Sequence, residues 1–205
     1  MTRTAGGRVA TERLAELARE ARACRVCEAF LPLGPRPVFR ASTTVRILIV
    51  GQAPGRLVHE TGIPWNDPSG NRLRDWLGLD RETFYDERRI AILPMGFCYP
   101  GVDRNGGDNP PRPECAPRWQ GRFLALMPHI KLTLLIGSYA QAFHLGAARK
   151  KTMGETVAAW REHPEQMLPL PHPSWRNTGW LKRNPWFQSE LLPVLRRRVA
   201  ALLEN

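Results

Sequence analysis

Apolar residues occur along this chain in short continuous runs that alternate with segments of helical spacing. Four runs predict buried β-strands, at residues 45–50, 89–93, 132–136 and 166–170. Apolar residues three or four positions apart predict amphipathic helices, one opening at Thr11 and others over residues 71–79, 115–127, 138–145, 152–161 and 186–203. Strands that alternate with helices are typical of a parallel sheet with helices on both faces. We therefore expect an α/β fold, a three-layer α/β/α sandwich with a central four-stranded, mostly parallel sheet.

The pattern predicts one domain. Residues 1–8 are expected to be a flexible N-terminal tail, and residues 9–205 a single folded domain, because the chain shows neither an internal repeat nor a second set of elements. Residues 99–113 and 171–185 are interpreted as loops, since Gly, Pro and Asn or Asp interrupt both. The first is too long for a simple connection and is a candidate functional segment.

Charge adds a class of partner. The chain has 30 Lys and Arg against 19 Asp and Glu, a formal net charge of +11. Such an excess favours a polyanion, with nucleic acid first and an acidic membrane surface second. A protein that is merely basic is the alternative.

The hydropathy pattern also bears on the compartment. Apolar runs are much shorter than the ~20 residues that span a bilayer, and residues 1–13 lack an apolar signal core. We therefore expect a cytoplasmic protein without disulfides or a membrane partner.

The four cysteines then need another explanation. Cys24 and Cys27 form a C-x-x-C pair, and 16 residues separate Cys98 from Cys115. Four thiolates can hold a zinc ion or an iron–sulfur cluster. Four unrelated buried cysteines are the plainer alternative. A thioredoxin-like redox pair is disfavoured, because this C-x-x-C precedes the first predicted strand.

Two loops are candidates for a binding site. Residues 51–55 (GQAPG) follow the first predicted strand, and residues 172–174 (HPS) follow the last. Glycine lets backbone amides approach a ligand closely, and a histidine can hold or release a proton near neutral pH.

These motifs and cysteines together resemble the uracil-DNA glycosylase superfamily, most closely its iron–sulfur family 4. The resemblance extends from about Ala15 to Leu203. It rests on the cysteine spacing, on GQAPG in the place of the first motif, on HPSWRN in the place of the second, and on the segment TGIPWNDPSGNRLRDWL. The resemblance implies a [4Fe-4S] cluster rather than zinc, held by Cys24, Cys27, Cys98 and Cys115. The cluster would be structural and would pin the loop between the last two cysteines against the N-terminal helix.

The resemblance also implies roles in base excision. His172 would donate a hydrogen bond to the departing base, and Trp65 would stack on it after it has flipped out of the helix. The backbone at Gly51, Gln52 and Ala53 would line the base pocket.

The second motif would contact the DNA. A phosphate would be bound by Ser174, while Trp175 and Arg176 would fill the gap that the flipped base leaves. Asn177 and Lys182 are expected to lie near phosphates, together with Arg183.

The chain departs from the family pattern at three positions. Ala53 stands where efficient relatives have the aspartate that orients the water, and Gln52 stands where family 4 has an acidic residue. We take Asp67 as the substitute catalytic carboxylate, with an Asx-turn as its alternative role. Pro94 stands where the family has an asparagine that reads uracil, which puts the base specificity in doubt.

The leading hypothesis is therefore a monofunctional DNA glycosylase that excises uracil or another deaminated base in base excision repair, as a monomer without a soluble organic cofactor. A catalytically weak or inactive member that binds damaged or single-stranded DNA is the alternative. A third reading is an unrelated metal-dependent α/β hydrolase that uses His172.

Overall fold

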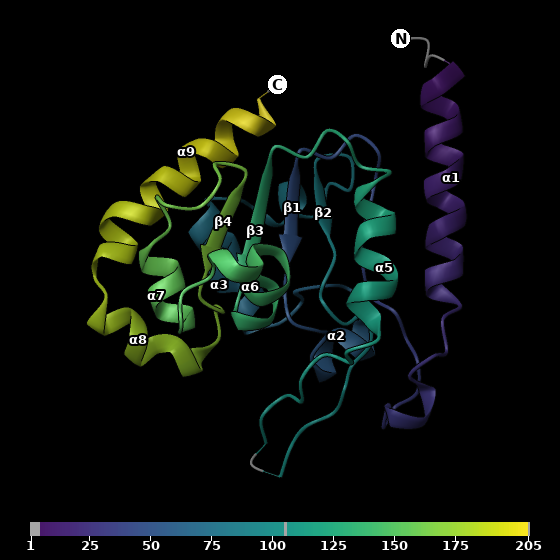
Figure 1. Cartoon of the computed structure of the whole chain (residues 1–205), viewed down its shortest axis with the longest axis horizontal. Helices are drawn as coiled ribbons and strands as arrows, with labels where there is room; N and C mark the ends of the chain where they lie inside the picture. Colours follow the sequence, from purple (N-terminus) through teal and green to yellow (C-terminus); the bar gives the residue numbers. More distant parts are fainter. Residues whose placement is uncertain (1–4, 105, 205) are drawn as a thin grey trace.

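A four-stranded parallel sheet forms the centre of the molecule (Figure 1). The computed structural model describes residues 5–104 and 106–204. The strands are β1 (Ile47–Val50), β2 (Ile90–Ile92), β3 (Leu132–Ile136) and β4 (Met167–Leu170), in the order β2-β1-β3-β4. Each pairs in parallel with its neighbours. The predicted α/β class and all four predicted strands are confirmed, with three of the strands one or two residues shorter at their ends.

Helices cover both faces of this sheet, because successive strand side chains point to opposite sides. Leu48 and Val50 belong to the core beneath α1 (Ala5–Arg22), α5 (Cys115–Leu124) and α6 (Ser138–Leu145). Ile47 and Ile49 belong to the core beneath α3 (Pro68–Leu77), α7 (Met153–Ala158) and α9 (Leu192–Leu203). All four strand side chains are fully buried, so both faces of β1 are interior.

The first helix begins earlier than the sequence pattern predicts. It is already helical at Ala5, so residues 5–8 are not the expected tail; residues 1–4 lie outside the described part of the chain. The Thr11 hydroxyl donates to the Gly7 carbonyl at 2.8 Å, so this residue lies inside the helix instead of capping it. Within the described residues, no helix combines the length and apolar character that a membrane span requires.

The C-terminal third is more helical than expected. The predicted loop over residues 171–185 contains a 3-10 turn (Trp175–Asn177) and helix α8 (Thr178–Arg183). The predicted closing helix is divided into a π-helical turn (Phe187–Leu191) and α9. Pro193 explains the division, since it has no N–H and its ring crowds the carbonyl four residues earlier.

Two further helices are too short for a periodic signal. They are α2 (Arg56–Thr61) and α4 (Arg81–Phe84). The first follows the loop after β1 and ends at Gly62, which adopts a left-handed conformation with φ of 69°.

The long segment after β2 projects from the edge at which the strands end (Figure 1). Val102 and Asp108 form an antiparallel bridge, and the Asp103 amide donates to the Gly107 carbonyl at 2.7 Å. We call residues 101–109 the hairpin. It stands at the carboxyl edge of the sheet, where ligands of open parallel sheets bind.

Candidate functional site

One pocket at the carboxyl edge brings both predicted motifs together. It is lined by residues 51–54 of the GQAPG loop, by Trp65, by Pro94 and by His172, and its empty space is about 390 Å³. The amides of Met95 and Gly96 donate to the carbonyls of Gly51 and Gln52, each at 2.9 Å. The first motif is therefore fixed to the segment after β2.

Trp65 forms one wall of this pocket in an unusual conformation. Its φ is 56°, in the left-handed region that a bulky residue rarely adopts. A Cβ at Gly51 would lie 2.8 Å from the indole ring, and a Cβ at Gly70 would lie 1.7 Å from the Trp65 carbonyl oxygen. Both glycines are thus required for the position of Trp65, whose ring centre lies 5.5 Å from that of His172.

His172 is held as a neutral hydrogen-bond donor. Desolvation by burial lowers the pKa of His172 to about 4, so the imidazole is uncharged at neutral pH. The Ser174 amide donates to Nδ1 at 3.2 Å. Because Nδ1 accepts a hydrogen bond, the proton of the neutral ring is on Nε2, which leaves Nε2–H as the donor.

The residues after His172 are divided between loop anchoring and exposure. The Asn177 side-chain amide donates to the His172 carbonyl at 2.8 Å, so it supports the loop. Trp175 is 75% exposed, and the Arg176 guanidinium lies 5.5 Å from its ring centre. Lys182 is exposed on α8. Trp175 and Lys182 are thus accessible to a partner at this edge.

Sequence reasoning did not single out Arg72, although it lies in the segment TGIPWNDPSGNRLRDWL, because nothing local distinguishes it from the other arginines. Its guanidinium donates to the Ser174 carbonyl at 3.1 Å and to the Thr178 hydroxyl at 3.4 Å. Helix α3 is thereby attached to the second motif, and the Ser174 carbonyl is occupied within the protein.

The two side chains proposed to replace the missing acid have partners within the fold. Asp67 caps α3, and its Oδ1 accepts from the Gly70 amide at 2.8 Å. Burial raises the pKa of Asp67. The Gln52 amide donates to the Asn109 carbonyl at 3.2 Å, so it contacts the hairpin. Asp67 therefore bonds to nearby backbone, as in the Asx-turn that the sequence left open, but it does so as the N-cap of α3.

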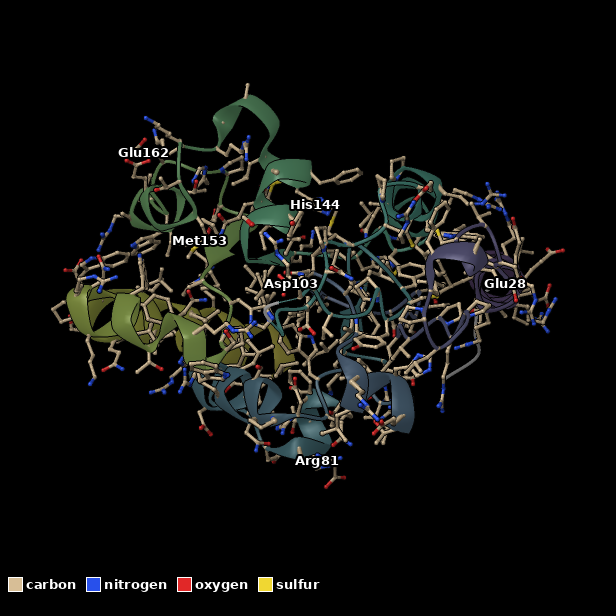
Figure 2. The ribbon with its side chains drawn as sticks, turned by 90° about the horizontal axis from the view of Figure 1, so that it is seen from below. Glu28, Arg81, Asp103, His144, Met153 and Glu162 are labelled. Atoms are coloured by element: carbon tan, nitrogen blue, oxygen red, sulfur yellow. The ribbon has the colours of Figure 1, made fainter. Side chains whose placement is uncertain are left out.

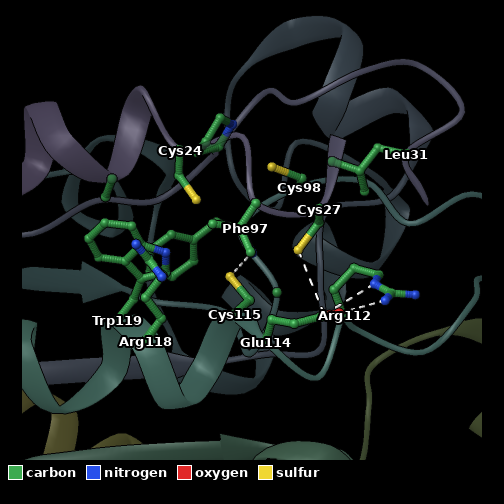
Figure 3. A pocket seen from close by; sticks show the side chains of 14 residues that line it. Cys24, Cys27, Leu31, Phe97, Cys98, Arg112, Glu114, Cys115, Arg118 and Trp119 are labelled. Atoms are coloured by element: carbon green, nitrogen blue, oxygen red, sulfur yellow. Dashed lines mark hydrogen bonds and ion pairs between the residues drawn. The ribbon is translucent and has the colours of Figure 1, made fainter. Parts of the chain in front are cut away.

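The four cysteines line a second pocket on the α1 and α5 side of the sheet (Figure 3). Cys24 and Cys27 follow α1, Cys98 follows β2, and Cys115 begins α5. Figure 3 shows their sulfur atoms around the same space, which Phe97 and Trp119 also border. The fold thus gathers residues that lie more than 70 positions apart.

The thiols are in a desolvated environment. Burial raises the pKa of Cys98 to about 11 and that of Cys115 to about 12, and it also raises the pKa of Cys27. The Phe97 amide lies 3.3 Å from the Cys115 sulfur, to which it donates. As free thiols these groups are uncharged at neutral pH.

The arrangement of the cysteines distinguishes between a single metal ion and an iron–sulfur cluster as the bound group. Within residues 5–104 and 106–204, no three His, Cys, Asp or Glu side chains are disposed to hold a single metal ion. One ion needs all its sulfur ligands about 2.3 Å from one point. A [4Fe-4S] cluster binds each cysteine through a different iron and so accepts a wider ring of sulfurs. The four cysteines that line this pocket match such a cluster in the number and type of its ligands.

A comparison with protein families gives one match. The model of the uracil DNA glycosylase superfamily matches residues 39–196, more than half of the chain. The match includes both motif loops, Trp65, Cys98 and Cys115, whereas Cys24 and Cys27 precede it.

Proposed function

The chain belongs to the uracil DNA glycosylase superfamily, and we propose that it is a monofunctional glycosylase that removes a deaminated base, uracil first, from DNA. Superfamily membership supports glycosylase chemistry on DNA. Uracil as the preferred base is part of the proposal.

The reaction places three demands on the protein. The base must leave the helix stack, its leaving group must be stabilised as negative charge develops, and a water must attack C1′ from the other side. The N-glycosidic electron pair goes to the base, and the water oxygen forms the new bond to C1′. The products are the free base and an abasic site.

The position of His172 in the pocket wall, with the Ser174 amide donating to Nδ1, is the observation that carries the proposal. An Nε2–H donor beside the pocket stabilises a developing oxyanion on the base. Because the ring starts uncharged, it does not require a counter-charge in the ground state. The Ser174 amide fixes the tautomer that this role needs.

The other pocket residues take the recognition roles. Trp65 offers an aromatic face for the flipped base, and the backbone at Gly51, Gln52 and Ala53 lines the pocket. Trp175 fills the space that the base vacates, with Arg176 beside it, while the Ser174 hydroxyl, Asn177 and Lys182 take the contacts to phosphates.

We also propose that the four cysteines hold a [4Fe-4S] cluster. Support comes from their shared pocket and from the Phe97 amide directed at the Cys115 sulfur, because N–H donors stabilise thiolate ligands. The cluster would join α1, the segment after β2 and α5 without taking part in base release.

The test is base release from defined oligonucleotides. Single- and double-stranded substrates with uracil, hypoxanthine or xanthine are incubated with the protein, and abasic sites are cleaved with alkali. His172→Ala is expected to slow release on the order of 10²-fold or more, while leaving the melting temperature close to that of the wild type. His129→Ala, an exposed histidine, is the matched control. Full activity of His172→Ala would overturn the role of the donor.

A second candidate function rests on the pocket wall. Ala53 and Pro94 both line the pocket, and neither side chain can hydrogen-bond water or a base. A DNA-binding member without base release would retain salt-sensitive affinity for uracil-containing DNA. In that case no shortened strand appears even when the protein is in large excess.

A further inference from the structure

The hairpin is attached to both motif loops. On one side the Arg176 guanidinium, from the second motif, donates to the Gly106 carbonyl at 3.0 Å. On the other side the side-chain amide of Gln52, from the first motif, donates to the Asn109 carbonyl at 3.2 Å. Two residues of the hairpin that lie three positions apart are thus each bound to a different motif loop, and Gln52 itself lines the pocket. Asp108 lies in the chain between these two attachment points.

The position of Asp108 is further restricted by the hairpin itself. It forms a β-bridge with Val102, and the neighbouring Asn109 amide donates to the Gly101 carbonyl at 2.9 Å. Asp103, on the opposite strand, accepts from the Gly107 amide at 2.9 Å. The backbone at Asp108 is thus held on both sides, while its side chain is exposed.

Two charged side chains from other parts of the chain interact electrostatically with Asp108. The pKa of Asp108 is raised from its ordinary value: partial desolvation, the largest cause, raises it, Arg176 lowers it, and Asp67 at the start of α3 raises it. These groups lie in the second motif and immediately before α3, next in the chain to elements that line the pocket. Asp108 is therefore near enough to both groups to interact with their charges.

The pocket itself lacks a carboxylate in the place the superfamily uses. Ala53 cannot orient water, and Oδ1 of Asp67 is bound by the Gly70 amide. A water that attacks C1′ needs an acceptor outside the base pocket, on the sugar side. The mouth of the pocket is that side, because the base occupies the interior.

We propose that Asp108 is the carboxylate that orients the attacking water. This inference rests on the proposed function. The Asp108 carboxylate accepts a hydrogen bond from the water and takes its proton as the bond to C1′ forms, while the electron pair of the N-glycosidic bond leaves with the base. The carboxylate then returns the proton to solvent. Arg176 is a positioning residue, because it holds the hairpin and its positive charge favours the ionised form of the carboxylate.

The test uses single-turnover release of uracil, with DNA affinity measured in parallel. Asp108→Asn is expected to slow release on the order of 10²-fold with less than about a threefold change in affinity. Asp108→Glu is expected to recover part of the rate. In the wild type the rate rises with pH as the carboxylate ionises, and in Asp108→Asn this dependence is lost.

Two controls separate this role from a structural one. Asp103→Asn makes the same charge change in the same hairpin and keeps an oxygen for the Gly107 amide, so its rate should remain within about threefold of wild type. Asp67→Asn likewise keeps an acceptor for Gly70 and should lose less than about tenfold.

Each outcome has a distinct meaning. A large loss in Asp67→Asn, with Asp108→Asn close to wild type, would assign the water to Asp67 and overturn the inference. If Asp108→Asn and Asp103→Asn lose the same release rate and their pH profiles are unchanged, the hairpin has only a structural role, and the inference is overturned. If the wild type releases no base at all, the proposed function itself fails.

Discussion

Single residues at the pocket act through their surroundings more than through their chemical type. His172 has an ordinary side chain, but burial and the Ser174 amide leave it neutral with Nε2 as its donor. Trp65 keeps a left-handed backbone because two glycines give its ring and carbonyl room. Neither property is visible in the residue type alone.

The depressed pKa of His172 predicts how stability depends on pH. The folded-state pKa of about 4 lies below the ordinary 6.5, so between these values the unfolded chain binds more protons. The free energy of unfolding should therefore fall as pH drops through this window, by on the order of 2 kcal/mol from this group. His144, whose pKa burial also lowers to about 4, contributes in the same direction.

Urea denaturation at about pH 7 and about pH 5 measures the effect. His172→Gln should lose less stability than wild type between the two conditions, and an NMR titration should place the His172 midpoint well below 6. An imidazole that titrates at its ordinary value would contradict the desolvated environment.

At the scale of elements, short caps and attachments build the site. Helix α3 starts at the Asp67 cap, where Gly70 passes beneath the Trp65 carbonyl, and its Arg72 reaches the second motif. The hairpin is attached to both motifs in the same way. These contacts couple elements that are distant from one another in the chain.

The cap of α3 gives a prediction at this scale. Asp67→Ala should lower the free energy of unfolding by about 1 kcal/mol, because the Gly70 amide loses its acceptor. It should also slow base release, since the first turn of α3 supports Trp65. Thr152→Ala is the matched control, because Thr152 caps α7 in a capping box.

Thermal melts and release assays on the same preparations separate the two effects. Thr152→Ala should lose a similar stability and keep the wild-type rate. Wild-type stability of Asp67→Ala would show that the cap does not hold the helix start.

At the scale of the whole molecule, the cysteine pocket connects three distant segments. The C-x-x-C after α1 faces the cysteines on either side of the hairpin segment (Figure 3). Seen from the side of the sheet's carboxyl edge, the hairpin around Asp103 lies between this region, near Glu28, and the α7 side, near Met153 (Figure 2). Loss of the cysteine site is therefore expected to loosen the hairpin as well as α1.

The proposed cluster predicts a measurable composition. Protein purified without oxygen should contain iron and sulfide in equal amounts and absorb broadly in the visible range. Cys24→Ser should lose the absorption and lower the melting temperature. Val26→Ser, between the two cysteines and 49% exposed, should retain both. Zinc in place of iron and sulfide would overturn the cluster.

The features that the sequence predicted correctly are those that depend on residues close together in the chain. Strand β3 and helix α6 have the predicted bounds, because buried runs and helical spacing are local signals. The prediction was wrong about the start of α1, and it did not include helix α8 or the π-helical turn. These features depend on contacts and backbone adjustments that periodicity does not report.

Local sequence patterns specify the α/β class, the position of the strands and the two loops that form the pocket, since alternation, hydropathy and glycine placement are properties of neighbouring residues. Folding is what desolvates His172, places Asp67 at a helix cap and brings the cysteines into one pocket. Folding also attaches the chain on either side of Asp108 to the two motifs. Such properties arise from groups that are distant in the chain and meet only after folding, so the charge state and geometry of the site depend on the complete fold.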